Sequence, residues 1–208
     1  METIDVGGAR RVPWNKGKLS GQKLPLKLRE IWAIRIRLQH AGSTRDLAMV
    51  NLAIESKLRA CDLTRLRVSD VCHASHVAAR ATVMQQKTQR LVRFEITEQT
   101  RASVKAWIKA SALASDDYLF PSRIYGSPHM STRRYARLVH RRIRSIALGD
   151  STYGTNTMRR TKASMLYRRT KNLRAVQLLP RHSTLESTVR YLGIEVDDAL
   201  EMAEQTDV

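Results

Sequence analysis

Arginine, lysine, histidine and tyrosine stand at points of the chain where they could carry out chemistry together. Arg59 lies in the run LRACDL, Lys87 in a polar stretch between two apolar runs, and Arg159 at the end of the run NTMR. His182 stands nine residues before Tyr191. Guanidinium groups hold phosphate oxygens through forked hydrogen bonds, a phenol can act as a nucleophile, and lysine or histidine can transfer protons. The set is therefore suited to metal-free cleavage of a phosphodiester.

The order of these residues resembles the tyrosine recombinase (phage integrase) family over about residues 26–204. The signatures of that family are Leu-Arg-x-x-Glu/Asp-Leu, a hairpin lysine, His-x-x-Arg, Leu-Gly-His, and a tyrosine nine residues after that histidine. The resemblance implies that Arg59 and Arg159 hold the scissile phosphate while Tyr191 attacks it to give a 3′-phosphotyrosine. It also implies that Lys87 protonates the leaving 5′-oxygen. The implied catalytic residues are Arg59, Lys87, Asn156, Arg159, His182 and Tyr191.

Two positions depart from the family pattern. Asn156 stands where the family has the histidine of His-x-x-Arg, and an amide cannot carry a proton near neutral pH. Pro180 and Arg181 replace the Leu-Gly that precedes the histidine. Two predictions therefore stay open: a site-specific recombinase that needs neither metal nor ATP, and a catalytically impaired DNA-binding accessory or regulatory protein on the same fold. A general basic nucleic-acid-binding protein would leave the order of the five residues unexplained.

Charge points to a polyanionic partner, of which nucleic acid is the commonest. The 208 residues hold 37 Lys and Arg against 19 Asp and Glu, a formal charge of +18. A ribosomal or membrane-surface protein would show a similar excess, so charge alone indicates no chemistry. Between residues 133 and 181 fourteen basic residues accompany one acid, Asp150, which favours a phosphate-binding surface. The predicted DNA contacts are Arg133, Arg134, Arg137, Arg141, Arg160 and Lys162.

The remaining chemistry-bearing residues favour no metal and no cofactor. Cys61 and Cys72 are too few for a disulfide framework, which indicates a reducing compartment. The run CHASH at residues 72–76 contains metal-binding side chains, but no second ligand pair follows at a zinc spacing. Because no apolar stretch approaches membrane-spanning length, we expect a cytoplasmic protein without a membrane contact.

The hydrophobic pattern predicts the elements that must position these residues: a mainly α fold with one small antiparallel β-sheet (α+β), as in a tyrosine recombinase catalytic domain. A capping box between Ser43 and Asp46 is expected to open the second helix, and Ser131 or Thr132 to cap a basic helix. Lys87 is expected at the turn of a hairpin. Helices are expected at 26–40, 43–56, around 62–68, 98–112, 131–148, 156–169, 172–179, 184–192 and 195–204, with the hairpin at 77–97.

Three regions are predicted along the chain. Residues 1–25 form a basic, flexible tail, residues 26–192 a catalytic DNA breaking–rejoining domain, and residues 193–208 an acidic helix and tail. The chain is expected to bind double-stranded DNA and to self-associate on it in a tetrameric synapse. The acidic helix carries an apolar stripe at Val196, Ala199, Leu200 and Ala203. It could dock on a neighbouring copy or pack on its own domain, and the sequence leaves both open.

Overall fold

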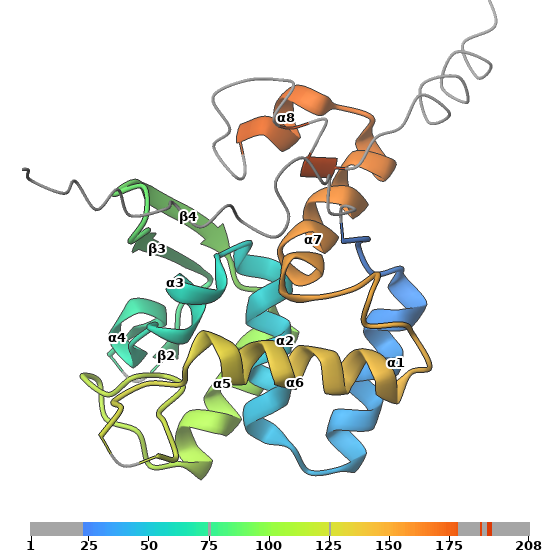
Figure 1. The fold of residues 1–208 in the computed structure, drawn as a ribbon. Helices are drawn as coiled ribbons and strands as arrows, with labels where there is room; N and C mark the ends of the chain where they lie inside the picture. The colour runs from blue at the N-terminus through green and yellow to red at the C-terminus, as the bar shows by residue number, and fades with distance from the viewer. Residues whose placement is uncertain (1–22, 75, 125, 179–187, 189–190, 193–208) are drawn as a thin grey trace, which may run out of the picture.

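The computed structural model describes residues 23–74, 76–124, 126–178, 188, 191 and 192 (Figure 1). Helices in this part are α1 Leu28–His40, α2 Thr44–Ser56, α3 Ala60–Thr64, α4 Val68–Val71, α5 Glu98–Ala110, α6 Thr132–Ser145, α7 Thr155–Thr170 and α8 Leu173–Leu178. Strands are β1 Cys72–His73, β2 His76–Val77, β3 Arg80–Met84 and β4 Leu91–Glu95. The prediction of a mainly helical fold with a small antiparallel sheet is confirmed.

Helix α2 runs through the centre of the molecule (Figure 1). It contacts α1, α5 and α7, and nearly all of its side chains from Ala48 onward are buried. A helix that is covered all round has no solvent face and belongs to the core. The same core continues through Leu58 and Leu63, which directly follow α2 in the chain. The residues after α2 are therefore held by the best-packed part of the fold.

Strands β3 and β4 form the predicted hairpin. Arg80 pairs with Glu95 and Met84 with Leu91, so the chain reverses between residues 84 and 91 and Lys87 lies in the turn. Val92 and Phe94 face the core, whereas their neighbours along β4 are exposed. This alternation fixes the register, because a slip by one residue would turn the apolar side chains to solvent.

Three details of the predicted local structure were wrong. The Ser43 side chain makes no capping hydrogen bond with the described residues, and the Asp46 carboxylate binds Arg45 and Arg142 instead of completing a capping box. Residues 60–71 form two short helices, α3 and α4, in place of one. A second small sheet precedes the hairpin, where Cys72 pairs with Val77 and His73 with His76. In the described part of the chain no group of three His, Cys, Asp or Glu side chains is placed to hold a metal ion.

The predicted cap of the basic helix is confirmed, since Ser131 Oγ accepts a hydrogen bond from Arg134 N at 3.2 Å. Thr188, Tyr191 and Leu192 are helical, in agreement with the helix expected at 184–192, whose other residues lie outside the described ones. The segments 1–22 and 193–208, with the helix expected at 195–204, also lie outside them. No helix of the described residues is long and apolar enough to cross a membrane.

Candidate active site

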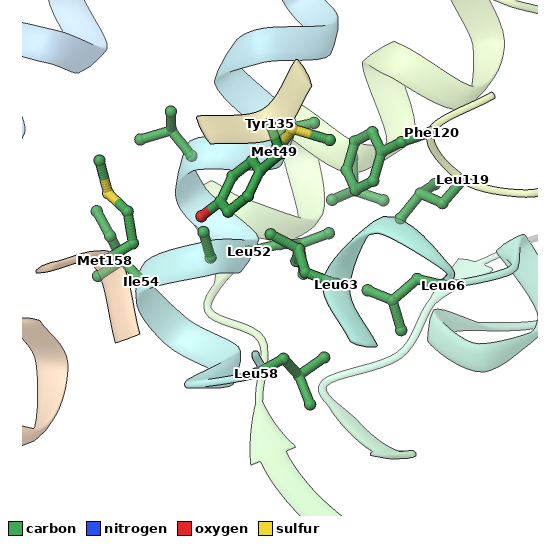
Figure 2. Packing of buried hydrophobic residues seen from close by; sticks show 14 of the residues in the cluster. Met49, Leu52, Ile54, Leu58, Leu63, Leu66, Leu119, Phe120, Tyr135 and Met158 are labelled. Atoms are coloured by element: carbon green, nitrogen blue, oxygen red, sulfur yellow. The ribbon is translucent and has the colours of Figure 1, made fainter. Parts of the chain in front are cut away.

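Arg59 is fixed by the core residue that precedes it. Leu58 is 2% exposed and belongs to the main apolar cluster, where it is labelled in Figure 2. Arg59 caps α3 with extended backbone, and Leu63 on that helix is also buried. The Arg59 side chain is half-buried and donates from Nη1 to Gln85 Oε1 at 2.8 Å. One nitrogen of the guanidinium is therefore held by the protein.

Arg159 is placed in the same way from another part of the chain. Met158, which precedes it on α7, is fully buried in the same cluster (Figure 2). Arg159 Nε donates to the carbonyl oxygen of Lys57 at 2.8 Å. Lys57 ends α2 with a φ of 56°, in the left-handed region that few residues other than glycine adopt readily. This bend brings a backbone carbonyl two residues before Arg59 to the guanidinium of Arg159.

The two arginines therefore lie close to one another. The pKa of Arg159 is lowered mainly by burial, and the positive charge of Arg59 lowers it further. The side chains of Tyr191, Asp62 and Cys61 act on it in the opposite direction. Two guanidiniums that repel one another at a half-buried surface form a site for an anion, because a bound phosphate would relieve that repulsion.

Tyr191 lies against Arg159 and Arg160. Its hydroxyl donates to the backbone carbonyl of Arg159 at 2.7 Å, and the guanidinium carbons of Arg159 and Arg160 lie 5.5 and 6.0 Å from the centre of its ring. Burial raises the pKa of the phenol, and this effect outweighs the lowering by the two arginines. The two arginines favour the phenoxide, but in this arrangement the phenol is neutral and its hydroxyl is bonded to the backbone of the protein.

Arg160 does not have the position that we predicted for a DNA contact. Its side chain is 6% exposed, and it donates to the carbonyl oxygens of Tyr191 and, at 2.6 Å, of Lys23. A buried guanidinium that holds two backbone carbonyls ties the two ends of the domain together. Direct contact with a phosphate backbone does not fit this burial.

A hydrogen bond joins Asp62 to the hairpin turn that carries Lys87. Lys87 is exposed in the hairpin turn, and the next residue back, Gln86, donates its backbone N–H to Asp62 Oδ1 at 3.0 Å. Asp62 is 3% exposed, and its Oδ2 has no hydrogen-bond partner among the described residues. The acidic residue of the LRACDL run therefore connects the Arg59 segment to the turn that carries Lys87.

Two predicted site residues are less closely defined. Asn156 is exposed in the first turn of α7, three residues before Arg159, so both lie on the same side of the helix. His182 lies outside the described residues. The structure thus places Arg159 beside Tyr191 and near Arg59, with Lys87 on a turn that adjoins the Arg59 segment.

The predicted DNA contacts on α6 form one basic surface. Arg134, Arg137 and Arg141 line a hollow of about 180 Å³ together with Arg45 from α2. The acidic residue there, Asp46, is already paired with Arg45 and Arg142. Arg133 lies exposed on the same helix. A hollow with this charge is suited to a phosphate group.

Lys162 lies elsewhere, at a cavity of about 570 Å³ between the hairpin and α7. Its Nζ is 3.7 Å from Glu95 Oε2. The cavity has an apolar floor that includes Phe94, Met165 and Leu166, and Lys57 also lines it. Burial and the charge of Lys162 lower the pKa of Lys57 to about 8, against the partial opposition of Glu55 and Glu95.

Comparison with known proteins gives one consistent result. Residues 27–196 match the model of the phage integrase family. The chain is 30% identical over 153 residues to the probable integrase/recombinase YoeC of Bacillus subtilis, an alignment that covers 74% of this chain and 80% of that protein.

Solved structures share the fold at low identity. XerA recombinase matches with a TM-score of 0.72 and 18% identity, over 90% of this chain and 66% of that one. XerH site-specific recombinase, bound to its difH substrate in a pre-cleavage complex, matches with a TM-score of 0.67 and 17% identity, over 88% of this chain and 55% of that one. The chain thus spans somewhat more than half of these two proteins.

Proposed function

The chain belongs to the phage integrase family, and on this premise we propose that it is a site-specific recombinase that cleaves and rejoins double-stranded DNA through a covalent 3′-phosphotyrosine. One observation carries the proposal: Arg159 lies against the ring of Tyr191 and donates to the carbonyl of Lys57, two residues before Arg59, so that Arg59 and Arg159, a hundred residues apart in sequence, lie near one another. A phosphodiester bound by both guanidiniums would offset the repulsion between them.

In the proposed reaction the two guanidiniums hold the non-bridging oxygens of the scissile phosphate while charge accumulates on them. Tyr191 Oη attacks phosphorus, the bond from phosphorus to the 5′-oxygen breaks, and the 3′-phosphate stays on the tyrosine. Lys87 gives a proton to the departing 5′-oxygen. His182 accepts the phenolic proton or donates to the phosphate. The reverse attack by a 5′-hydroxyl rejoins the strand, so no metal or ATP is consumed.

Tyr191 must first leave the position in which the structure holds it. Its hydroxyl proton is engaged by the Arg159 carbonyl, and burial favours the neutral phenol. A bound phosphate between Arg59 and Arg159 supplies the competing anion that would draw the phenol away from the backbone. The arrangement therefore describes a resting state, in which the nucleophile is protected until DNA is bound.

The decisive experiment uses nicked duplexes whose target sequence is randomised, because the chain does not reveal its site. The nick lets the short cleaved fragment diffuse away and traps the protein on DNA. We expect adducts that survive denaturant in the wild type and are absent in Tyr191→Phe. Sequencing the trapped DNA identifies the site. DNA binding without any adduct would overturn the enzyme proposal.

The arginines of α6 are proposed to contact the phosphate backbone, together with Lys162 and the basic segment 1–25. Removing one phosphate contact lowers the slope of log affinity against log salt by about 0.9. Arg137→Gln, which alters the basic hollow, is expected to weaken binding and reduce that slope. An unchanged slope would remove the hollow from the DNA interface.

A second function is supported by Asn156. This exposed amide beside Arg159 cannot replace a histidine in proton transfer, and the fold would then act as a DNA-binding accessory protein. Asn156→His separates the two proposals. A rise in adduct yield means that the asparagine limits an active enzyme. Continued absence of adduct with intact DNA binding favours the accessory role. Both functions place the protein in the cytoplasm.

Self-association on DNA, in a tetrameric synapse, is also proposed. Helix α1 exposes Leu28, Trp32 and Ile36, four residues apart and about half exposed, on one face with basic neighbours. The acidic segment 195–204, with its own apolar stripe, is complementary to that face and is proposed to dock there from a second copy. Light scattering on DNA should show smaller assemblies for a chain ending at Leu192 and for Trp32→Glu. Unchanged assembly would favour packing of the segment on its own domain.

A further inference from the structure

The residue that directly follows strand β3, Gln85, occupies an unusual place in the site. Gln85 is 6% exposed, although it lies only two residues before the exposed Lys87. Its backbone closes the hairpin turn: Gln85 N donates to Arg90 O at 3.0 Å, and Gln89 N donates to Gln85 O at 2.8 Å. With its main chain in the turn and its side chain buried, Gln85 connects the turn to the interior.

The Gln85 side chain makes its part of that connection through a single atom. Gln85 Oε1 accepts hydrogen bonds from Arg59 Nη1 at 2.8 Å and from Thr88 Oγ1 at 2.9 Å. Thr88 adjoins Lys87. The guanidinium proposed to hold the phosphate and the turn proposed to carry the general acid are therefore joined through one carbonyl oxygen. Neither can change its position freely while both bonds are made.

An amide suits this task better than the alternatives. A carboxylate at the same place would neutralise Arg59 and compete with the phosphate for its donors. An apolar side chain would leave a half-buried guanidinium without one of its acceptors. The neutral amide oxygen orients Arg59 through one Nη and leaves its charge, and its remaining donors, available to DNA.

We propose that Gln85 is a positioning residue that sets the Arg59 guanidinium and the Lys87 turn in one geometry, so that phosphate binding and protonation of the leaving group are aligned together. The proposal rests on the recombinase function argued above. It adds a residue outside the implied catalytic set, one that acts through Arg59 and Lys87 without touching DNA itself.

A sulfur-substituted substrate separates the two effects of Gln85. If sulfur replaces the bridging 5′-oxygen of the scissile phosphate, the leaving thiolate needs no proton, because thiols have a pKa near 8.5. Lys87→Met should then be slow on the oxygen substrate and restored on the sulfur one. For Gln85→Met, with similar length and no strong acceptor, we expect a roughly 100-fold loss of single-turnover cleavage on oxygen. On the sulfur substrate the loss caused by Gln85→Met should shrink by about tenfold. The loss that remains, about tenfold, is the part that comes from the displaced Arg59 guanidinium.

The neighbouring glutamine supplies a matched control. Gln86 Oε1 accepts from Arg65 Nη1 at 2.6 Å, but this contact is exposed and involves neither Arg59 nor Thr88. Gln86→Met keeps the backbone N–H that binds Asp62 and removes only this exposed side-chain contact, so it should cleave both substrates within about twofold of the wild type. The proposal is overturned if Gln85→Met matches this control, or if sulfur recovers none of its loss.

Amide hydrogen exchange tests the connection without any catalysis. We expect residues 85–90 to exchange roughly tenfold faster in Gln85→Met than in the wild type or Gln86→Met. Gln85→Glu keeps the acceptor, so exchange should stay slow while cleavage falls because the carboxylate competes with the phosphate. Equal exchange in all variants would overturn the positioning role. A wild type that forms no adduct on either substrate would instead contradict the recombinase function, and the exchange result would still stand.

Discussion

The two arginines and the tyrosine of the site are held by parts of the molecule that differ greatly in extent. Leu58 and Met158, which precede Arg59 and Arg159, belong to the main cluster, which extends through α1 to α7 and the hairpin (Figure 2). Tyr191 packs instead on a small second cluster around α7 and α8. The buried members of that cluster among the described residues are Ala163, Tyr167, Val176 and Leu192.

The difference in packing agrees with the roles proposed for the two arginines and the tyrosine. Groups that stabilise a transition state must already point to the developing charge, since reorganisation at the moment of reaction costs free energy. The proposed nucleophile, Tyr191, donates its hydroxyl to the Arg159 carbonyl and would have to leave it before it reacts. Segments with few buried contacts open at lower free energy than the core does. The fold therefore anchors the proposed phosphate-binding arginines in the large core and the proposed nucleophile on the smaller cluster.

The largest expected effect comes from Arg159, which directly follows the core residue Met158. Arg159→Lys keeps a positive charge but loses the forked geometry and the bond to the Lys57 carbonyl. Single-turnover adduct formation should fall roughly 1000-fold, whereas DNA affinity should fall less than about tenfold. Arg168→Lys, an exposed position on the same helix, is the control. Comparable losses in cleavage and in affinity would mean that Arg159 serves binding alone.

Truncating one buried leucine in each cluster tests directly whether the two clusters differ in stability. Leu58→Ala should lower the free energy of unfolding by about 3 kcal/mol, as expected for a leucine in a packed core. Leu192→Ala, in the smaller cluster, should change global unfolding much less and should mainly release Tyr191. Denaturant unfolding gives the first quantity, and hydrogen exchange around residues 188–192 gives the second. Equal global losses would show that both clusters unfold as one unit.

Lys57, which ends α2 in the left-handed conformation, gives a pH-dependent effect of somewhat smaller size. The pKa of Lys57 is lowered to about 8 mainly by burial, so keeping it charged below pH 8 opposes folding. The cost is present in full at pH 7 and is relieved as pH rises from 8 toward the ordinary value of about 10.5. Lys57→Met should therefore raise stability at pH 7 by at most about 3 kcal/mol and remove that rise with pH.

Urea unfolding between pH 7 and 10 measures this effect, and Lys109→Met, at an exposed position, should leave the pH profile unchanged. The thioether side chain introduced by Lys57→Met is expected to pack against the apolar Phe94 and Met165, which line the same cavity. If wild type and variant had parallel pH profiles, the burial of the Lys57 ammonium would not be the cause.

The sequence was sufficient for features that depend on local pattern. Apolar spacing predicted α1, α2 and α5 closely, and the polar stretch between two apolar runs correctly placed Lys87 in a turn. The site residues were inferred from the resemblance of their order along the chain to the signatures of the phage integrase family. The structure places Arg59 and Arg159 near one another, and their catalytic roles stay a prediction.

Features that depend on distant partners were not predictable. Arg160 has the same residue type and a neighbouring position to Arg159, yet it turns inward because two backbone carbonyls, of Lys23 and Tyr191, meet there. Asp46 has the spacing of a capping box, but Arg142, nearly a hundred residues away, takes its carboxylate. Gln85 shows no sequence signal at all. In each case the deciding partner is far away in the chain, where spacing carries no information.

The smallest expected effect concerns the tyrosine itself. Burial raises the pKa of Tyr191, so the stability from its neutral, buried phenol is present below the ordinary value near 10 and is lost as pH rises through the raised one. Absorbance of tyrosinate, taken as the difference between wild type and Tyr191→Phe, should show a titration above pH 10 in the free protein. Because Arg160 lowers this pKa, Arg160→Gln should move the titration still higher. A short duplex that carries the selected site should move it down, since the phenol then leaves its buried position beside the Arg159 carbonyl. A titration at pH 10 or below without DNA would mean that Tyr191 is already released, and the contrast between a fixed phosphate site and a stored nucleophile would be wrong.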